Sequence, residues 1–135
     1  MKLPVWVTAV QTALSVFWCA GCGRAGTSSA MTQAQTNLTN LVAECKELSR
    51  QGAGQGKDTW SASDPLPPTI KSLSPQSVQL LAGDTATVID IQTSGGFQHR
   101  GYLVVCESKD PNFIPSKGRG WKVVKIGPGV FTYRE

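Results

Sequence analysis

Two neighbouring side chains in the run GGFQHRG, residues 95–101, could take part in chemistry. His99 could act as a general base near neutral pH, and Arg100 could hold an anion beside it at the mouth of a pocket. A general base needs an orienting partner and a nucleophile, and no spacing in the sequence supplies them. We therefore predict a hairpin in which Gly95 and Gly96 form the turn and His99 is a partly buried strand residue. No catalytic residue is predicted, and a small hydrolase using His99 is the least favoured alternative.

A second run, SKGRGWKVVK, residues 116–125, interleaves cations with an aromatic ring. Lys117, Arg119 and Lys122 surround Trp121, and Lys125 follows. Such a strip could bind phosphate or an acidic polysaccharide. The alternative is a solvated loop that enters an amphipathic strand, with lysines that keep a sheet edge from pairing with other chains. The candidate ligand-binding residues are His99, Arg100, Trp60, Lys117, Arg119, Trp121 and Lys122.

Several chemistries have no sequence signal. The chain contains no Walker-type phosphate loop, no zinc metalloprotease helix and no serine nucleophile elbow. Its acidic residues are scattered, so no pair is convincing as an acid and a base. We predict neither a cofactor nor a metal. The formal charge of +4 on 135 residues is modest, and nucleic acid is not an expected partner.

Cys19 and Cys22 stand three residues apart at the end of an apolar run, Leu3 to Trp18. A redox pair would need a strand before it and a helix after it, but a glycine- and serine-rich stretch follows. A metal site would need a second pair of ligands downstream, and Cys45 and Cys106 are isolated. The length and polar interruptions of the apolar run instead suit an export signal.

The residues Ala20, Gly21 and Cys22 resemble the lipobox of bacterial lipoproteins, although Cys19 stands where that family usually has leucine. The resemblance implies cleavage before Cys22 and lipidation of its sulfur. The expected organisation is a signal peptide over residues 1–21, a flexible tether over 22–31 and one small domain over 32–135. The partners implied are a membrane, reached through the lipid, and an envelope protein or glycan. Ordinary secretion is the alternative.

Removal of the leader would leave two cysteines in the mature domain, Cys45 and Cys106. An oxidising compartment would allow them to form a disulfide. The bond would close a long loop and add about 4 kcal/mol by the chain-entropy estimate. The alternative for Cys45 is a small core residue on a helix.

The first element expected in the domain is a helix over residues 32–50. Thr32 and Gln35 fit a capping box, and Gly52 ends the pattern. The apolar positions recur at helical spacing and comprise Leu38, Leu41, Val42, Cys45 and Leu48. A loop follows, in which we expect Trp60 to be packed onto the domain, and Pro67 and Pro68 then open a short helical turn.

The period changes to two after Ser77, which predicts strands over residues 77–82, 86–92, 97–106, 121–126 and 130–134. Short links between them indicate an antiparallel meander of four to five strands, and the fold class is α+β, with the helix across one face. On the third strand neither face is cleanly polar. Either both faces of the sheet are covered, or Gly101 marks a bulge, which we favour.

These features predict an exported, lipid-anchored, non-catalytic binding or accessory module at the cell envelope. The alternative is a secreted polyanion- or glycan-binding module that uses the strip from Lys117 to Lys125. The domain, with its LPPxI and GGFxHxG runs, is similar to short bacterial proteins of unknown function, a resemblance that implies no activity.

Overall fold

The structure is a computed structural model that describes residues 22–94 and 97–135. The expected signal peptide, with its cleavage site, lies outside the described residues. The chain divides at Gln35 and Thr36 into two units. Of the first, the structure describes helical backbone from Cys22 onward, and the second, Thr36–Glu135, contains the sheet. The fold is α+β, with one long helix and an antiparallel sheet, as the sequence predicts.

Helix α1 spans Cys22–Gln55 and is longer at both ends than the predicted 32–50. Its bounds include residues 22–31, for which we expected a tether. The helix continues through Gly52 to Gln55, so the prediction that Gly52 ends it is wrong. A Cβ at this position would lie 2.5 Å from the carbonyl oxygen of Lys57 and 2.8 Å from the Trp60 ring. Gly52 therefore permits close packing rather than ending the helix. The residue that follows the last turn is Gly56, whose φ of +66° suits the position after a helix C-terminus.

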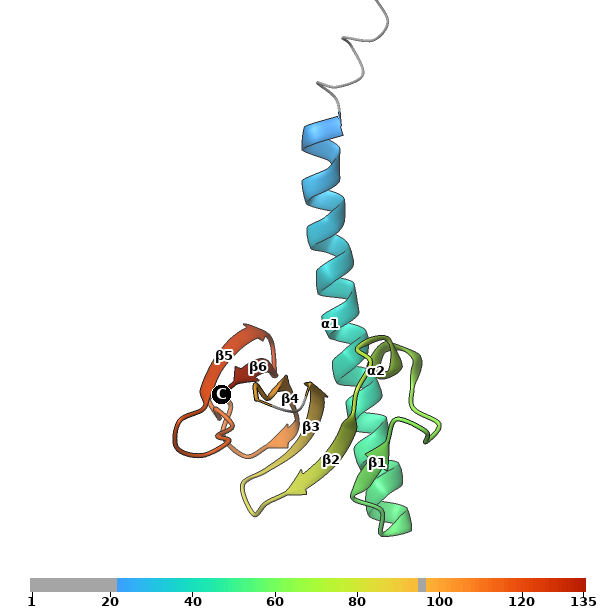
Figure 1. Cartoon of the computed structure of the whole chain (residues 1–135), viewed down its shortest axis with the longest axis vertical. Helices are drawn as coiled ribbons and strands as arrows, with labels where there is room; N and C mark the ends of the chain where they lie inside the picture. Colours follow the sequence, from blue (N-terminus) through green and yellow to red (C-terminus); the bar gives the residue numbers. More distant parts are fainter. Residues whose placement is uncertain (1–21, 95–96) are drawn as a thin grey trace, which may run out of the picture. The chain divides into compact units, whose positions relative to one another are not determined.

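The sheet has six strands, one or two more than predicted (Figure 1). Their order is β1-β2-β3-β4-β6-β5, and all neighbours are antiparallel. The strands are β1 (Thr59–Ser61), β2 (Ser77–Ala82), β3 (Ala86–Ser94), β4 (Arg100–Ser108), β5 (Lys122–Gly127) and β6 (Val130–Arg134). The predicted meander is wrong in one respect, because β6 lies between β4 and β5. Strand β1 is not among the predicted strands.

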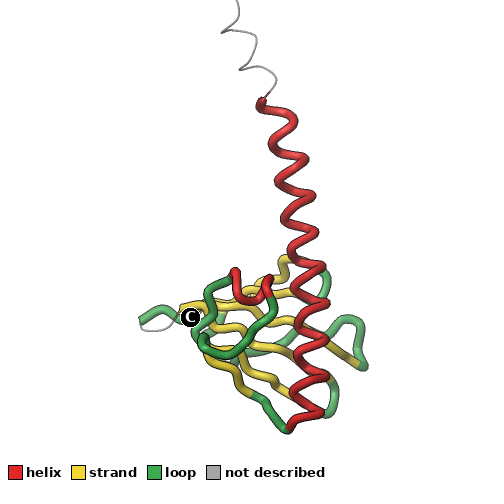
Figure 2. Tube along the Cα trace, turned by 90° about the vertical axis from the view of Figure 1, so that its right-hand side faces the viewer, coloured by secondary structure: helices red, strands yellow, loops and turns green. Residues whose placement is uncertain are grey.

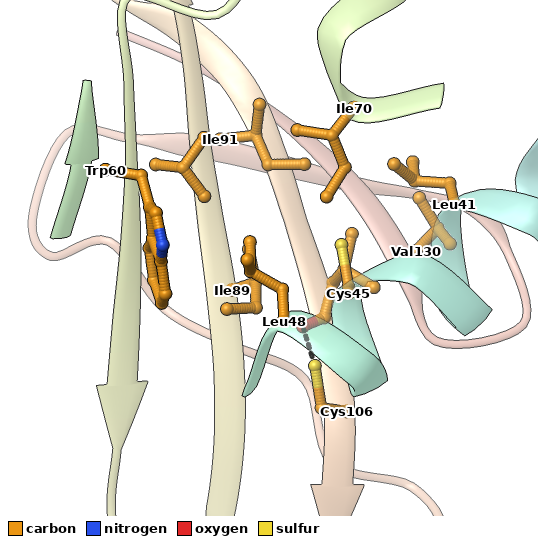
Figure 3. Packing of buried hydrophobic residues seen from close by; sticks show 11 residues of the cluster. Leu41, Cys45, Leu48, Trp60, Ile70, Ile89, Ile91, Cys106 and Val130 are labelled. Carbon is orange, nitrogen blue, oxygen red and sulfur yellow. Dashed lines mark hydrogen bonds between the residues drawn. The ribbon is translucent and has the colours of Figure 1, made fainter. Parts of the chain in front are cut away.

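One face of the sheet is covered by the part of α1 that follows Thr36 (Figure 2). Leu41, Cys45 and Leu48 repeat at helical spacing and are at most 3% exposed. They pack on the inward side chains of the strands (Figure 3). The cluster comprises Leu41, Cys45, Leu48, Trp60, Ile70, Val78, Ile89, Ile91, Val104, Cys106 and Val130. Trp60 is therefore a core residue of β1, as the packing interpretation predicts.

Helix α2, Pro68–Ser72, adds Ile70 to this core. Proline at its first position matches the prediction. The carboxylate of Glu44 on α1 accepts hydrogen bonds from the backbone N–H of Thr69 at 2.9 Å, the hydroxyl of Thr69 at 2.8 Å and the N–H of Ile70 at 3.1 Å. A carboxylate satisfies N–H groups that a helix N-terminus leaves without partners. Glu44 thus joins the two helices over the sheet.

The opposite face of the sheet is covered by the connection from β4 to β5. Val88, Leu103, Phe131 and Tyr133 are buried there, with Phe113 and Trp121 from the connection against them. Both faces are therefore covered, which explains why neither side of β4 is polar. Register shifts also occur in the β3–β4 pair, one of them between Gln92 and Ser94, opposite Gly101 and Arg100. The extra residue at this shift is Thr93 of β3, whereas Arg100 and Gly101 are successive paired residues of β4. The favoured bulge at Gly101 is therefore wrong, and the coverage of both faces explains the pattern.

Candidate functional site

Three cations form one row across neighbouring strands. Arg100 of β4 is paired with Arg134 of β6, and Arg134 is in turn paired with Lys122 of β5. Directly opposed residues of an antiparallel sheet point to the same face. The three side chains therefore share the face that α1 covers elsewhere, and all three residues are exposed. We call this set the basic row.

The two arginines of the basic row occupy the closer kind of cross-strand pair. The N–H of Glu135 donates to the carbonyl of His99, which makes Arg100 and Arg134 a non-hydrogen-bonded pair. The Cα atoms of such pairs are about 4.5 Å apart, against about 5.5 Å for hydrogen-bonded pairs. Three positive charges thus start from backbone positions within roughly 10 Å of one another. Like charges placed directly opposite each other destabilise a sheet, so this arrangement is costly without a counter-charge.

The basic row lines an open pocket of about 430 Å³. The next set of cross-strand neighbours on this face, two residues closer to the core along each strand, also lines the pocket and consists of Tyr102, Thr132 and Val124. Thr93, at the register shift of β3, lines the same pocket, and its hydroxyl donates to the carbonyl of Arg100 at 3.3 Å. The pocket therefore combines cations, hydroxyl groups and one apolar side chain, a combination that suits a polar anionic ligand.

No carboxylate among the described residues pairs with the basic row. The ion pairs among the described residues are Arg50–Glu47, Lys57–Asp64 and Lys117–Asp90, and His99 lies 3.8 Å from Glu135. Arg100 donates to the amide oxygen of Gln98 at 2.8 Å, which leaves its charge uncompensated. The three charges are therefore available to a ligand.

Lys117, predicted to be part of a ligand-binding strip, is instead bonded within the fold. It lies on the opposite face of the sheet and forms a hydrogen-bonded ion pair with Asp90, whose side chain is 5% exposed. The other carboxylate oxygen of Asp90 accepts a hydrogen bond from the hydroxyl of Tyr133 at 2.8 Å. The ammonium group also lies 4.6 Å from the centre of the Tyr133 ring. Burial and the Asp90 carboxylate raise the pKa of the Tyr133 hydroxyl, which therefore stays a donor.

Trp121 packs on the same face as Lys117. Its ring meets Tyr133 edge-on at 5.4 Å and Lys117 lies 5.4 Å from its centre. Lys122, the next residue, points to the other face because side chains alternate along a strand. Arg119 is exposed in the loop between Gly118 and Gly120, which both have positive φ. The expected basic strip is thus divided between the two faces and a loop.

His99 contacts neighbours through both ring nitrogens. Its Nδ1 lies 3.2 Å from Nε2 of Gln92, and its Nε2 lies 3.8 Å from a carboxylate oxygen of Glu135. The ring also packs against Trp121, with the ring centres 5.8 Å apart and the planes tilted by 47°. None of these contacts joins the ring to a hydroxyl or a thiol that could act as a nucleophile. His99 is partly buried, as predicted, but it lies just before β4 rather than in a strand, and its contacts link the start of β4 to β3 and to the C-terminal residue.

The remaining candidates lie away from the pocket. Trp60 is 6% exposed in the core next to β2, near the opposite edge of the sheet. Cys45 and Cys106 are both buried free thiols, so the structure does not contain the predicted disulfide between them. Burial raises the pKa of both thiols more than any other cause does, and the pKa of Cys106 is raised to about 11. Thiols of such high pKa are uncharged at neutral pH and are poor nucleophiles.

Residue spacing along the chain could not identify Arg134, because its partners are on two other strands. Within residues 22–94 and 97–135, no group of three or more His, Cys, Asp or Glu side chains could hold a metal ion. No helix in that part of the chain is both long and apolar enough to cross a membrane. Comparison of the chain with protein-family models, with curated proteins and with solved structures found no match.

Proposed function

We propose that the chain is a non-catalytic binding module for an anionic ligand. The observation that carries this proposal is the basic row, in which three side-by-side cations without a carboxylate partner among the described residues line one pocket. Two arginines can hold a carboxylate or phosphate group with paired hydrogen bonds, which a single lysine cannot do. The hydroxyls of Tyr102 and Thr132 supply further hydrogen-bond donors around that anion.

The proposed site uses different residues from the polyanion-binding strip that the sequence predicts. Lys117 is bonded to Asp90, and Lys125 lies 6.0 Å from the Phe131 ring on the other face. Lys122 is the one cation of the strip that lines the pocket, where it joins Arg100 and Arg134. A compact site of this kind favours a ligand with closely spaced negative charges over a long, evenly charged chain.

Arg134→Gln tests the site because Arg134 is the middle member of the basic row. We expect affinity for tripolyphosphate to fall about tenfold, since one charge-assisted contact is lost. The same substitution should raise the stability of the unliganded protein by about 0.5 kcal/mol, because it removes repulsion between opposed cations. Calorimetric titration and urea unfolding measure the two effects.

Two charge-matched variants control this experiment. Lys71→Gln, on α2, and Arg119→Gln, in the loop before β5, each remove one exposed positive charge outside the pocket. Both should leave the affinity within about twofold, since only screened, distant charge is lost. Equal losses in all three variants would mean that net charge, rather than the basic row, determines binding, and would contradict the proposal.

We further propose that the module is exported and anchored through a lipid on Cys22. The support is the resemblance of Ala20, Gly21 and Cys22 to a lipobox, after an apolar run. Growth of a bacterial host with a labelled fatty acid should label the protein, and Cys22→Ala should abolish the label. A label that survives Cys22→Ala, or the absence of label on the unaltered chain, argues against the anchor.

A further inference from the structure

The outermost strand next to the pocket has an open edge. Strand β5 pairs with β6 on one side, and no other described strand pairs with it (Figure 1). The opposite edge of the sheet is β1, which has three residues, whereas β5 has six. An edge strand presents backbone N–H and C=O groups that can pair with an added strand. The edge of β5 is therefore the longer of the two places where a strand can be added.

The register identifies the residues whose backbone groups face outward. Since Arg134 and Arg100 form a non-hydrogen-bonded pair, the backbone groups of Arg134 point towards Lys122 of β5. These groups alternate in direction along a strand, so Lys122 and Val124 bond inward, and Val123 and Lys125 face outward. A register shift between Lys125 and Gly127 then ends the regular edge. The usable edge is thus the segment Lys122–Lys125.

The side chains of this segment define what an added strand would meet. Lys122 and Val124 stand on the pocket face, and Val124 is 46% exposed. Val123 and Lys125 stand on the other face. An added strand places residues directly beside these four, so its complement is acidic, apolar, apolar and acidic. We take addition to be antiparallel, as between all neighbouring strands of this sheet, so the residues beside Val123 and Lys125 are those whose N–H groups face β5.

From this edge and its charges, and on the basis of the proposed anion-binding function, we infer that the ligand is an extended acidic peptide segment that adds to β5. A carboxylate beside Lys122 also comes within the field of Arg134 and Arg100 in the pocket. A second copy of the chain is a poor occupant of this edge. Pairing of β5 with another β5 would bring the lysines of both strands together, and their like charges would repel. The lysines thus select an acidic strand and reject a copy of β5.

The probe is a blocked peptide with the core Glu-Val-Val-Glu between threonines, titrated into the full mature chain. Two isomers carry N-methyl groups on alternate backbone amides, one set facing β5 and the other facing solvent. Methylation of the set that faces β5 should weaken binding at least about tenfold, whereas the other set should be tolerated. In the protein, Lys125→Pro removes an outward N–H and should bind more weakly than Lys125→Gln, which loses only the charge. If Lys125→Pro fails to fold, the two peptide isomers still decide the question.

The outcomes separate this inference from the proposed function. Equal binding of both methylated isomers would show attraction by charge alone and would overturn strand addition. Binding of tripolyphosphate without binding of the peptide would also overturn it, while the anion site stands. If the unliganded chain forms a dimer and Lys125→Pro converts it to a monomer, the occupant of the edge is a second copy, and the peptide is rejected. Failure of both ligands to bind would reject the anion site together with strand addition.

Discussion

Replacement of Lys117 by methionine is expected to destabilise the domain by roughly 3 kcal/mol, because it leaves a buried carboxylate without its cation. Asp90 is 4% exposed, and its carboxylate has two partners, Lys117 and Tyr133. The tyrosine hydroxyl alone satisfies one oxygen and supplies no charge. Urea unfolding of the purified chain measures the loss, and the midpoint should fall with little change in slope.

The reciprocal substitution provides the control. Asp90→Asn leaves Lys117 without a carboxylate, but the lysine side chain is 23% exposed and can reach water. Its cost should therefore be clearly smaller than that of Lys117→Met. The double variant should be more stable than Lys117→Met alone, since no buried charge remains unpaired. A Lys117→Met cost below about 1 kcal/mol would put this pair among ordinary surface ion pairs and contradict the interpretation.

The strand bounds could be predicted in part, and the largest difference is at β4, which spans Arg100–Ser108 rather than residues 97–106. The sequence predicts β2 and β6 at their observed bounds, because the alternating apolar residues and the flanking turns are local signals. Strand β1 has no such signal. It has three residues, pairs with β2 and has the Trp60 side chain in the core. Only the contact with a strand far along the chain makes it a strand.

The order of the last two strands depends on burial rather than on the turn between them. The turn Gly127–Gly129 pairs β5 with β6 whichever of them lies next to β4. Strand β6 brings Phe131 and Tyr133 into the core, whereas β5 carries Lys122 and Lys125. Placing the more apolar strand inside and the lysine-bearing strand at the edge would have given the observed order. A simple meander places β5 inside instead, which is why the predicted order is wrong.

The cations of the predicted basic strip do not share one surface, for a related reason. Residues adjacent along a strand point to opposite faces, so Trp121 and Lys122 cannot line one surface. The cations that do meet are one residue on each of three strands, and two of them, Arg100 and Lys122, were among the predicted candidates. Arg134 joins them through the register, which the sequence does not specify without the strand order.

Gly101→Ala is expected to be at least as damaging as Lys117→Met, with a loss of roughly 3–4 kcal/mol. A Cβ at Gly101 would lie 2.2 Å from the carbonyl oxygen of Ile91 and 2.5 Å from the hydroxyl of Tyr133. The first contact is with the backbone of the neighbouring strand, so β3 and β4 must separate. The second displaces the Tyr133 hydroxyl that bonds Asp90. Urea unfolding again measures the loss.

Two further variants identify which contact dominates. Gly54→Ala is the matched control, because a Cβ there meets nothing within 4 Å. Alanine is the better helix former, so this change should stabilise the protein by about 0.5–1 kcal/mol. Adding Tyr133→Phe to Gly101→Ala removes the hydroxyl but leaves the Ile91 carbonyl, and should not restore stability. Restoration would show that the tyrosine contact, rather than the approach of the two strands, requires glycine at this position.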